Sequence, residues 1–174
     1  MNSWRLRLRC LGAVMAAAVA LAGCARSDAA SVKPTPGQAV KALEIPNLPA
    51  DLLSLKLAPE DVSADVGKVP AAFIDALSLY SLRHNDLVMA TLQVSRFNEG
   101  ANVKAEKFRQ TVVNQIGATA PRKLRLGGET VYLTTGTKQS IGVWFKDRYL
   151  FVLATRADYD EPRTLLRKAL EIKP

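Results

Sequence analysis

Few side chains in this chain carry the chemistry that enzymes and metal sites need. The single histidine, His84, stands in a polar triplet with Asn85 and Asp86. The two cysteines, Cys10 and Cys24, both belong to the first 24 residues. Because common zinc, copper and haem sites use several histidine or cysteine ligands, we expect no metal site and no cofactor, and we interpret His84 as a surface residue in a turn.

Motifs for nucleophilic catalysis and phosphate binding also depart from the known patterns. Residues 139–142, Gln-Ser-Ile-Gly, do not form the Gly-x-Ser-x-Gly turn of hydrolases. Residues 126–129, Leu-Gly-Gly-Glu, lack the Gly-Lys-Ser/Thr ending of a phosphate-binding loop and fit a hairpin turn better. Two acidic groups stand at predicted helix starts, where acids cap unpaired N–H groups: Glu60 with Asp61, and Asp158 with Asp160 and Glu161. We therefore expect no enzyme activity.

A basic cluster is the most suggestive feature of the second half of the chain. Alternation along a strand places Lys123 and Arg125 on the side opposite Leu124 and Leu126. Basic residues of the preceding helix extend this cluster, so that the predicted anionic-partner patch consists of Lys104, Lys107, Arg122, Lys123 and Arg125, with Arg109 beside them. The alternative is a solvated strand face without a partner.

Aromatic residues near the end of the chain give a second hint. Trp144 alternates with Val143 and Phe145 along a predicted strand, so one side of that strand belongs to the core. The other side is either an exposed apolar patch around Trp144 or lies under a helix. In a carrier of small ligands or lipids, Trp144 would instead line an apolar cavity between sheet and helices, with a volume of about 300 Å³ or more.

The first residues have the three parts of a targeting segment. Arg5, Arg7 and Arg9 are basic, and residues 10–22 are all apolar or glycine. This run is shorter than the roughly 20 residues of a membrane-spanning helix. We expect residues 1–23 to act as a signal peptide that is removed.

The end of this segment, Leu21-Ala22-Gly23-Cys24, resembles the lipobox of bacterial lipoprotein precursors. The resemblance implies a diacylglyceryl thioether on Cys24 and cleavage between Gly23 and Cys24. The protein would then be lipid-anchored at the cell membrane or the outer membrane, outside the cytoplasm. The alternatives are an ordinary secretory signal in which Cys24 is incidental, or an uncleaved apolar anchor.

Removal of residues 1–23 would change the charge of the chain, and export would change the partners that we expect. The mature chain would hold 21 basic and 16 acidic side chains, and the excess lies in residues 101–174, which hold 14 basic and 7 acidic ones. The formal charge of that half is therefore +7. Outside the cytoplasm we expect anionic lipid, cell-wall polymer or another envelope protein as partner, and no nucleic acid.

Proline and glycine divide the first half of the mature chain. Residues 24–42 contain Pro34, Pro36 and Gly37, which indicates a lipidated N-terminus followed by a flexible tether. Residues 43–174 form the predicted globular domain. Within it, residues 51–57 are expected as a short helix or strand, and residues 59–68 as an acidic helical turn or two.

The remaining elements follow from periodicity and turn signals. Residues 76–83 and 87–97 predict a hairpin with one buried side, and Asn102 predicts the cap of a helix that ends at a left-handed Gly117. Four short strands follow in a meander, at 122–126, 129–134, 139–146 and 148–155, and a last helix starts around Pro162. The order ββ-α-ββββ-α predicts a single small α+β domain whose largely antiparallel sheet is covered by helices.

This element order is similar to that of the extrinsic photosystem II P-subunit-like sandwich domains, which some actinobacterial lipoproteins share. No functional motif of that group is matched, so the resemblance implies a fold and no activity. The leading hypothesis is a non-catalytic, lipid-anchored envelope protein that binds a partner, and the alternative is the carrier with an apolar cavity.

Overall fold

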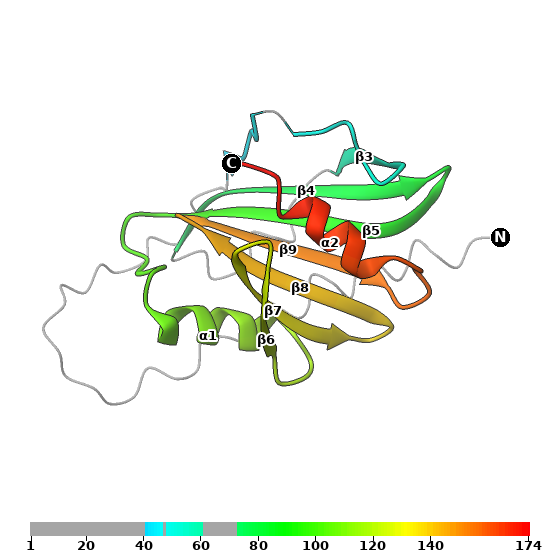
Figure 1. Cartoon of the computed structure of the whole chain (residues 1–174). Coiled ribbons are helices and arrows are strands. Elements are labelled where there is room, and N and C mark those ends of the chain that lie inside the picture. Colours follow the sequence, from blue (N-terminus) through cyan, green and yellow to red (C-terminus); the bar gives the residue numbers. More distant parts are fainter. Residues whose placement is uncertain (1–40, 47, 61–72) are drawn as a thin grey trace, which may run out of the picture.

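The computed structural model describes residues 41–46, 48–60 and 73–174, and in these the chain forms a single small domain (Figure 1). They hold a nine-stranded, mostly antiparallel sheet and two short helices. The strands are β1 (Lys41–Ala42), β2 (Asp51–Leu52), β3 (Leu55–Glu60), β4 (Ile74–His84), β5 (Leu87–Phe97), β6 (Arg122–Leu126), β7 (Glu129–Gly136), β8 (Gln139–Lys146) and β9 (Tyr149–Arg156). The helices are α1 (Glu106–Ile116) and α2 (Pro162–Ala169).

The sheet joins two locally paired groups of strands. Its order is β2-β3-β4-β5-β9-β8-β7-β6, with every neighbouring pair antiparallel. The outer edge of β4 is shared: β3 pairs with its second half, and β1 pairs in parallel with Ala76 and Leu77. The contact between β5 and β9 connects the β4–β5 hairpin to the β6–β9 meander, so the two groups form one sheet.

The turns of the sheet confirm the predicted hairpins. Asn85 takes a positive φ of 53° between β4 and β5, a conformation that asparagine tolerates better than most residues. Gly127 and Gly128 have φ values of 59° and 86°, as a two-residue primed turn between β6 and β7 requires. The strands predicted on both sides of these turns are confirmed to within a few residues.

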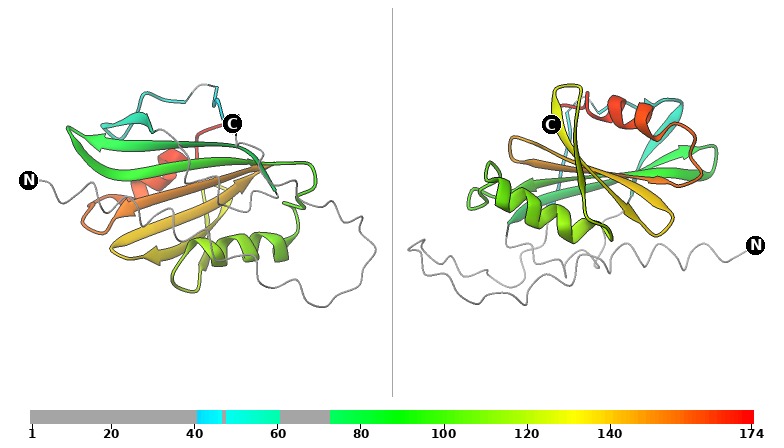
Figure 2. Two further views of the ribbon diagram at one scale, coloured as in Figure 1. Left: turned by 180° about the vertical axis from the view of Figure 1, so that it is seen from behind. Right: turned by 60° about the horizontal axis from the view of Figure 1, so that its bottom comes forward.

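The central strands β8 and β9 are buried on both faces. All residues from Ile141 to Phe145 are buried, although successive side chains of a strand point to opposite sides. Trp144 belongs to one apolar cluster, whereas Val143 and Phe145 belong to a second. The core therefore consists of two layers with the sheet between them, and Figure 2 shows α2 and α1 on opposite sides of the strands.

Helix α2 closes the first layer and is tied to the sheet through its C-terminal end. Leu165 and Ala169 have no exposed surface, and Pro162 stands at the helix start as predicted. The Nζ of Lys146 donates hydrogen bonds to the carbonyl oxygens of Leu170 and Ile172. A cation at this position satisfies carbonyls that the helix leaves unpaired and interacts favourably with the negative end of its dipole.

Helix α1 closes the second layer, but its ends differ from the prediction. It begins at Glu106, four residues after Asn102, and the residue at the cap position is Ala105, without a side-chain cap. Gly117 ends the helix in extended backbone with φ −103°, not in the left-handed region. Glycine is required there for space, because an added Cβ would overlap the side chain of Thr134 on β7.

The N-terminal part of the domain contains strands that the sequence did not predict as such. Lys41 and Ala42, assigned to the tether, form β1 because they pair with β4. The segment at 51–57 is a hairpin of β2 and β3, and β3 continues to Glu60. The predicted helical turn is wrong for residues 59 and 60, since β4 pairs with them, and its remainder lies outside the described residues.

Among the described residues, the predicted acidic caps are not formed; Asp61 lies outside the described residues. Glu60 lies in β3 and pairs with Arg83 at 2.8 Å. Asp158 pairs with Arg156 at 2.5 Å, and Glu161 stands at the cap position of α2 without a side-chain cap hydrogen bond. Arginine side chains on the adjacent strands compete successfully for these carboxylates because they offer charge-assisted hydrogen bonds.

The fold class is confirmed in its coarser part. The domain is single, small and largely antiparallel, and the order from β4 to α2 matches ββ-α-ββββ-α. It is rich in β-structure, because its helices have only 11 and 8 residues against nine strands in the described ranges.

The close approach of Gly117 to Thr134 yields a test of the packing between α1 and β7. We expect Gly117→Ala to lower the free energy of unfolding by about 1–3 kcal/mol, because overpacking forces neighbouring atoms to move. Urea unfolding measures this change. Gly100→Ala is the matched control, since its Cβ would meet only the Asn98 side chain at 3.4 Å. Equal urea midpoints for the two variants would contradict this close packing of Gly117 against Thr134.

Candidate functional site

The structure brings part of the predicted basic patch together where β6 lies beside α1. The Nζ of Lys123 is 3.0 Å from an Oε1 of Glu106, the first residue of the helix. This contact confirms that Lys123 faces the helix, on the side of the strand away from Leu124. Arg122 shares the side of Leu124 and therefore does not belong to the same surface as Lys123.

Glu106 neutralises the centre of the predicted patch. Its carboxylate accepts hydrogen bonds from Lys123 and from the Tyr132 hydroxyl, the latter at 3.2 Å. The hydrogen bond from Lys123 holds the pKa of Glu106 below its ordinary value, with a smaller contribution in the same direction from Tyr132. Burial, followed by the charge of Glu106, raises the pKa of the Tyr132 phenol. Lys123 thus has an internal partner in the folded domain.

Arg109 is also engaged within the domain. Its Nε donates a hydrogen bond to the carbonyl oxygen of Val103 at 2.6 Å, and its guanidinium lies 5.3 Å from the centre of the Phe145 ring. A cation over an aromatic face is attracted by the electron density of the ring. The contact fastens the start of α1 to β8, which is a structural role.

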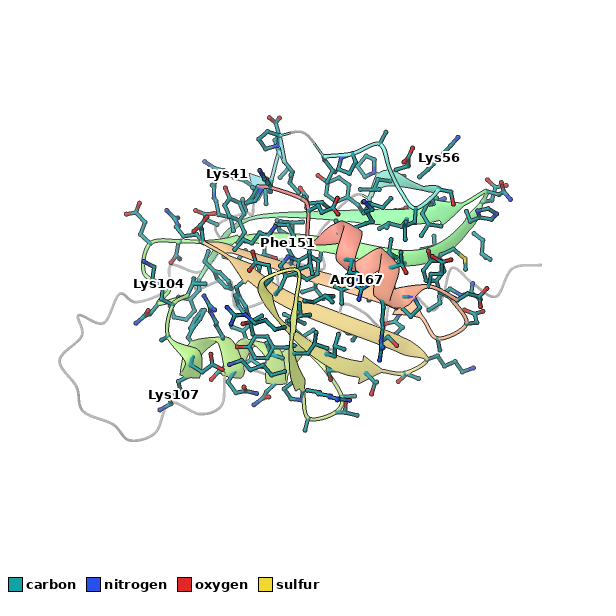
Figure 3. All side chains as sticks on the ribbon, viewed as in Figure 1. Lys41, Lys56, Lys104, Lys107, Phe151 and Arg167 are labelled. Atoms are coloured by element: carbon teal, nitrogen blue, oxygen red, sulfur yellow. The ribbon has the colours of Figure 1, made fainter. Side chains whose placement is uncertain are left out.

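The other cations of the patch face solvent. Lys104, Lys107 and Arg125 are exposed, and within the described ranges they form no ion pair or side-chain hydrogen bond. In Figure 3, Lys104 and Lys107 point outward from the start of α1. The predicted patch therefore divides into two parts. Lys123 is paired with Glu106, whereas Lys104 and Lys107 are unpaired at the start of α1 and Arg125 is exposed on β6.

An aromatic row runs along the side of the sheet on which α1 packs, and no pattern in the sequence predicted this row. Phe73 contacts Phe108 edge to face at 5.8 Å, and Phe108 contacts Phe97 in the same way at 5.3 Å. The row continues through Phe145 to Tyr132. Its outer end is Phe73, which is 46% exposed. No local signal in the sequence marks Phe73 as exposed.

Trp144 does not form an exposed patch. It has no exposed surface and stacks on Phe151 with ring centres 5.1 Å apart and planes at 8°. Its indole N–H finds no hydrogen-bond partner within the described part of the domain. The pair lies in the layer closed by α2, so the prediction of core against a covering helix is confirmed, and the alternative of a surface patch at Trp144 is wrong.

A shallow groove lies at the rim of the domain, away from the aromatic row. It is open to solvent, has a volume of about 500 Å³, and is formed where the β2–β3 turn meets the C-terminal residues. Its lining mixes apolar and oppositely charged side chains: Pro49, Leu52, Leu53, Ile172, Asp51, Glu171, Lys168 and Lys173. Trp144 is not part of it.

The remaining sequence predictions concern His84, the cleavage site, metal binding and a membrane-spanning helix. His84 is exposed at the end of β4. Gly23 and Cys24 lie outside the described residues. Within the described ranges, no three histidine, cysteine or acidic side chains gather in a way that could hold a metal ion. In the same ranges no helix has the length and apolar character needed to cross a bilayer.

The Glu106–Lys123 pair yields a prediction of pH dependence. A carboxyl whose pKa is lowered on folding stabilises the protein above its unfolded pKa, and the contribution disappears as pH falls through the folded pKa. We expect Glu106→Gln to lower the urea midpoint at neutral pH and to lose this effect well below pH 4.5, the ordinary pKa of the group. Glu129→Gln, an acid of β7 without an ion pair in the described ranges, should show no such pH-dependent difference.

The burial of Trp144 can be tested by fluorescence. A chain that starts at residue 24 lacks Trp4, so Trp144 is its only tryptophan. We expect a blue-shifted emission that soluble iodide quenches poorly, and a loss of about 3–5 kcal/mol of stability in Trp144→Ala. Quenching comparable to that of the urea-unfolded protein would contradict this position of the ring.

Comparison with known proteins gives no match to any family model, curated protein or solved structure. The arrangement of the chain's own residues is therefore the basis for a functional assignment. In the described part of the domain this arrangement consists of a two-layer apolar core, an open groove at the rim, and exposed lysines beside the aromatic row.

Proposed function

We propose that the protein is a lipid-anchored lipoprotein outside the cytoplasm, whose domain is a non-catalytic binding module of the cell envelope. The observation that carries the proposal is the order of basic residues, a short apolar run and Leu21-Ala22-Gly23-Cys24 at the start of the chain. Lipid on Cys24 would hold the domain at the cell membrane or the outer membrane. We also propose the α+β class, with α2 and α1 covering opposite faces of the sheet.

The anchor would work by burial of hydrocarbon. Each buried methylene contributes about 0.8 kcal/mol, and stable attachment takes two acyl chains or one chain with a second signal. A diacylglyceryl group on Cys24 meets this requirement without a spanning helix. The mature chain would then have no other cysteine, so the fold depends on its two apolar layers and not on disulfides.

The packing of the core supports a binding module over a carrier. A carrier needs an enclosed apolar cavity of about 300 Å³ or more, and Trp144 was the predicted lining of such a cavity. Trp144 packs instead on Phe151 in the layer that includes Leu153 and Leu165. The groove at the rim is large enough, about 500 Å³, but it is open and carries four charged side chains. The carrier remains the alternative, with this groove as its binding site.

The positions of the polar groups support a role in binding without catalysis. His84 is exposed, while Glu60 and Asp158 form ion pairs with Arg83 and Arg156. Lys104 and Lys107, by contrast, present uncompensated positive charge to solvent. Such a surface favours an acidic envelope protein, anionic lipid or wall polymer, and nucleic acid is not proposed as a partner outside the cytoplasm.

Intact-mass analysis of protein extracted from membranes tests the anchor. We expect the wild-type mass to equal residues 24–174 plus the acyl groups on Cys24. Cys24→Ser should lack the acyl mass. Cys10→Ser is the matched control, because Cys10 belongs to the removed segment and its substitution should leave the mature mass unchanged. Unacylated wild-type protein that retains Met1, or that is cleaved at another bond, would overturn the proposal.

A further inference from the structure

We propose that one end of the domain, formed by Phe73, Lys104 and Lys107, docks on a membrane surface that contains anionic phospholipid. We call these three residues the tether-side surface. The inference rests on the proposed function, because the lipid on Cys24 brings the domain to the membrane. It adds a defined orientation: the start of α1 faces the headgroups, and the β4–β5 turn faces away.

The register of the sheet places the tether-side surface where the chain enters the domain. Lys41 in β1 pairs with Ala76 near the start of β4, and Ile74 pairs with Phe97 at the end of β5. The backbone N–H of Asn98 donates to the carbonyl oxygen of Phe73 at 2.8 Å. The first strand, Phe73 and the loop that leads into α1 therefore share one end of the sheet.

Figure 3 shows the same arrangement in space. Lys41, Lys104 and Lys107 lie toward the left of the view, whereas Lys56 lies at the far right, near the β4–β5 turn. Lys41 is the first described residue, and it lies at the end of the sheet that also carries the loop with Lys104 and the start of α1. About 17 residues separate Cys24 from Lys41, which permits a reach of roughly 60 Å when extended.

Among the described residues, the charge balance of this end leaves the two lysines uncompensated. Asp75 pairs with Arg96 at 2.7 Å and approaches Arg148 at 3.7 Å, and Arg148 also approaches Glu99 at 3.6 Å. These two acids and two arginines balance one another. Glu106 is paired with Lys123.

Lys41 is also exposed at this end, and within the described ranges it forms no ion pair. Lys104 and Lys107 also remain as excess positive charge, which the negative potential of an anionic leaflet attracts.

The exposed ring beside the lysines gives the surface the mixed character that membrane interfaces favour. Phe73 is 46% exposed and rests edge to face on Phe108, the residue that follows Lys107. Phe108 is in turn fixed against buried Phe97, so the exposed ring is presented by a rigid support. Apolar rings at the headgroup level combined with nearby lysines are typical of interfacial binding.

The opposite end also carries exposed lysines, Lys56 and Lys138, but exposed Asp86, Asp160 and Glu161 offset their charge there. Leu87, 47% exposed, is the other large apolar residue exposed in the described ranges, and it follows Asp86 in the β4–β5 turn. The arginine of that region, Arg83, is paired with Glu60. Charge therefore distinguishes the two ends, and it favours the tether-side surface for contact with anionic lipid.

A weak contact is sufficient because the anchor makes docking intramolecular. A lipid on Cys24 confines the domain to a layer a few tens of ångströms deep, where the effective concentration of the surface is high. Two lysines and one ring, too few to recruit a soluble protein, can then set the orientation of a tethered one. Salt screens these exposed charges, so the preference for this orientation decreases as the salt concentration rises.

The experiment uses the acylated protein in vesicles and single thiol probes. The sulfur of Cys24 is occupied by lipid, so an introduced cysteine is the only free thiol. Asn102→Cys places a fluorophore on an exposed residue beside Lys104, and Asp86→Cys places the matched control in the β4–β5 turn. Vesicles contain phosphatidylcholine with or without phosphatidylglycerol, and a lipid-attached quencher reports proximity to the surface.

We expect the Asn102→Cys probe to be quenched in vesicles with phosphatidylglycerol and to recover in high salt, whereas the Asp86→Cys probe stays bright in both. Lys104→Gln with Lys107→Gln should weaken docking by about fivefold for each residue. Phe73→Ser should weaken it further. Lys56→Gln with Lys138→Gln, two exposed lysines elsewhere, should leave it unchanged. Urea midpoints of all variants check that they remain folded.

The outcomes separate the two proposals. Acylated protein that stays on both kinds of vesicle but shows equal quenching of the two probes overturns the docking surface and leaves the anchor intact. Quenching that is independent of phosphatidylglycerol and of both lysines overturns it as well, in favour of a neutral contact or another partner. Protein without acyl mass overturns the proposed function, and the inference with it.

Discussion

The burial of β8 and β9 on both faces is the constraint on which the rest of the structure depends. Side chains from Ile141 to Phe145 are buried in both directions, so each face of these strands requires its own cover. Helix α2 and the strands of the N-terminal part supply one cover, around Trp144 and Phe151. Helix α1 supplies the other, around Val143 and Phe145. Burial of apolar surface contributes about 25 cal/mol per Å² to the free energy of folding. A domain without disulfides therefore requires both layers.

The chemistry of the surface follows from how α1 is held in place. The apolar side of the helix packs on the sheet, and its first turn is fastened by Glu106 to Lys123 and Tyr132 and by Arg109 over Phe145. Groups that hold the helix are thereby removed from any external patch. Two lysines of the predicted patch, Lys104 and Lys107, stay exposed at the start of the helix, next to the end of the aromatic row, and Arg125 stays exposed on β6.

The interior and the surface of the described domain hold different kinds of side chains. Trp144, the residue with the largest aromatic side chain in the core, stabilises the protein and takes no part in an accessible site. Among the described residues, His84 is exposed and Glu60 is held in an ion pair. At one end of the described domain, the exposed ring of Phe73 stands beside Lys104 and Lys107, which form no ion pair in the described ranges.

The sequence by itself determined the elements whose signals are local. The β4–β5 hairpin, the β6–β9 meander and both helices follow from alternation, helical spacing and turn residues such as Asn85 and Gly127, because these act between near neighbours in the chain. Only the tertiary structure decided that β5 pairs with β9, that Lys41 and Ala42 join β4, and that Arg83 takes the carboxylate of Glu60. It also decided that Trp144 is buried and Phe73 exposed. These outcomes depend on which distant surfaces meet, and a pattern of neighbouring residues does not contain that information.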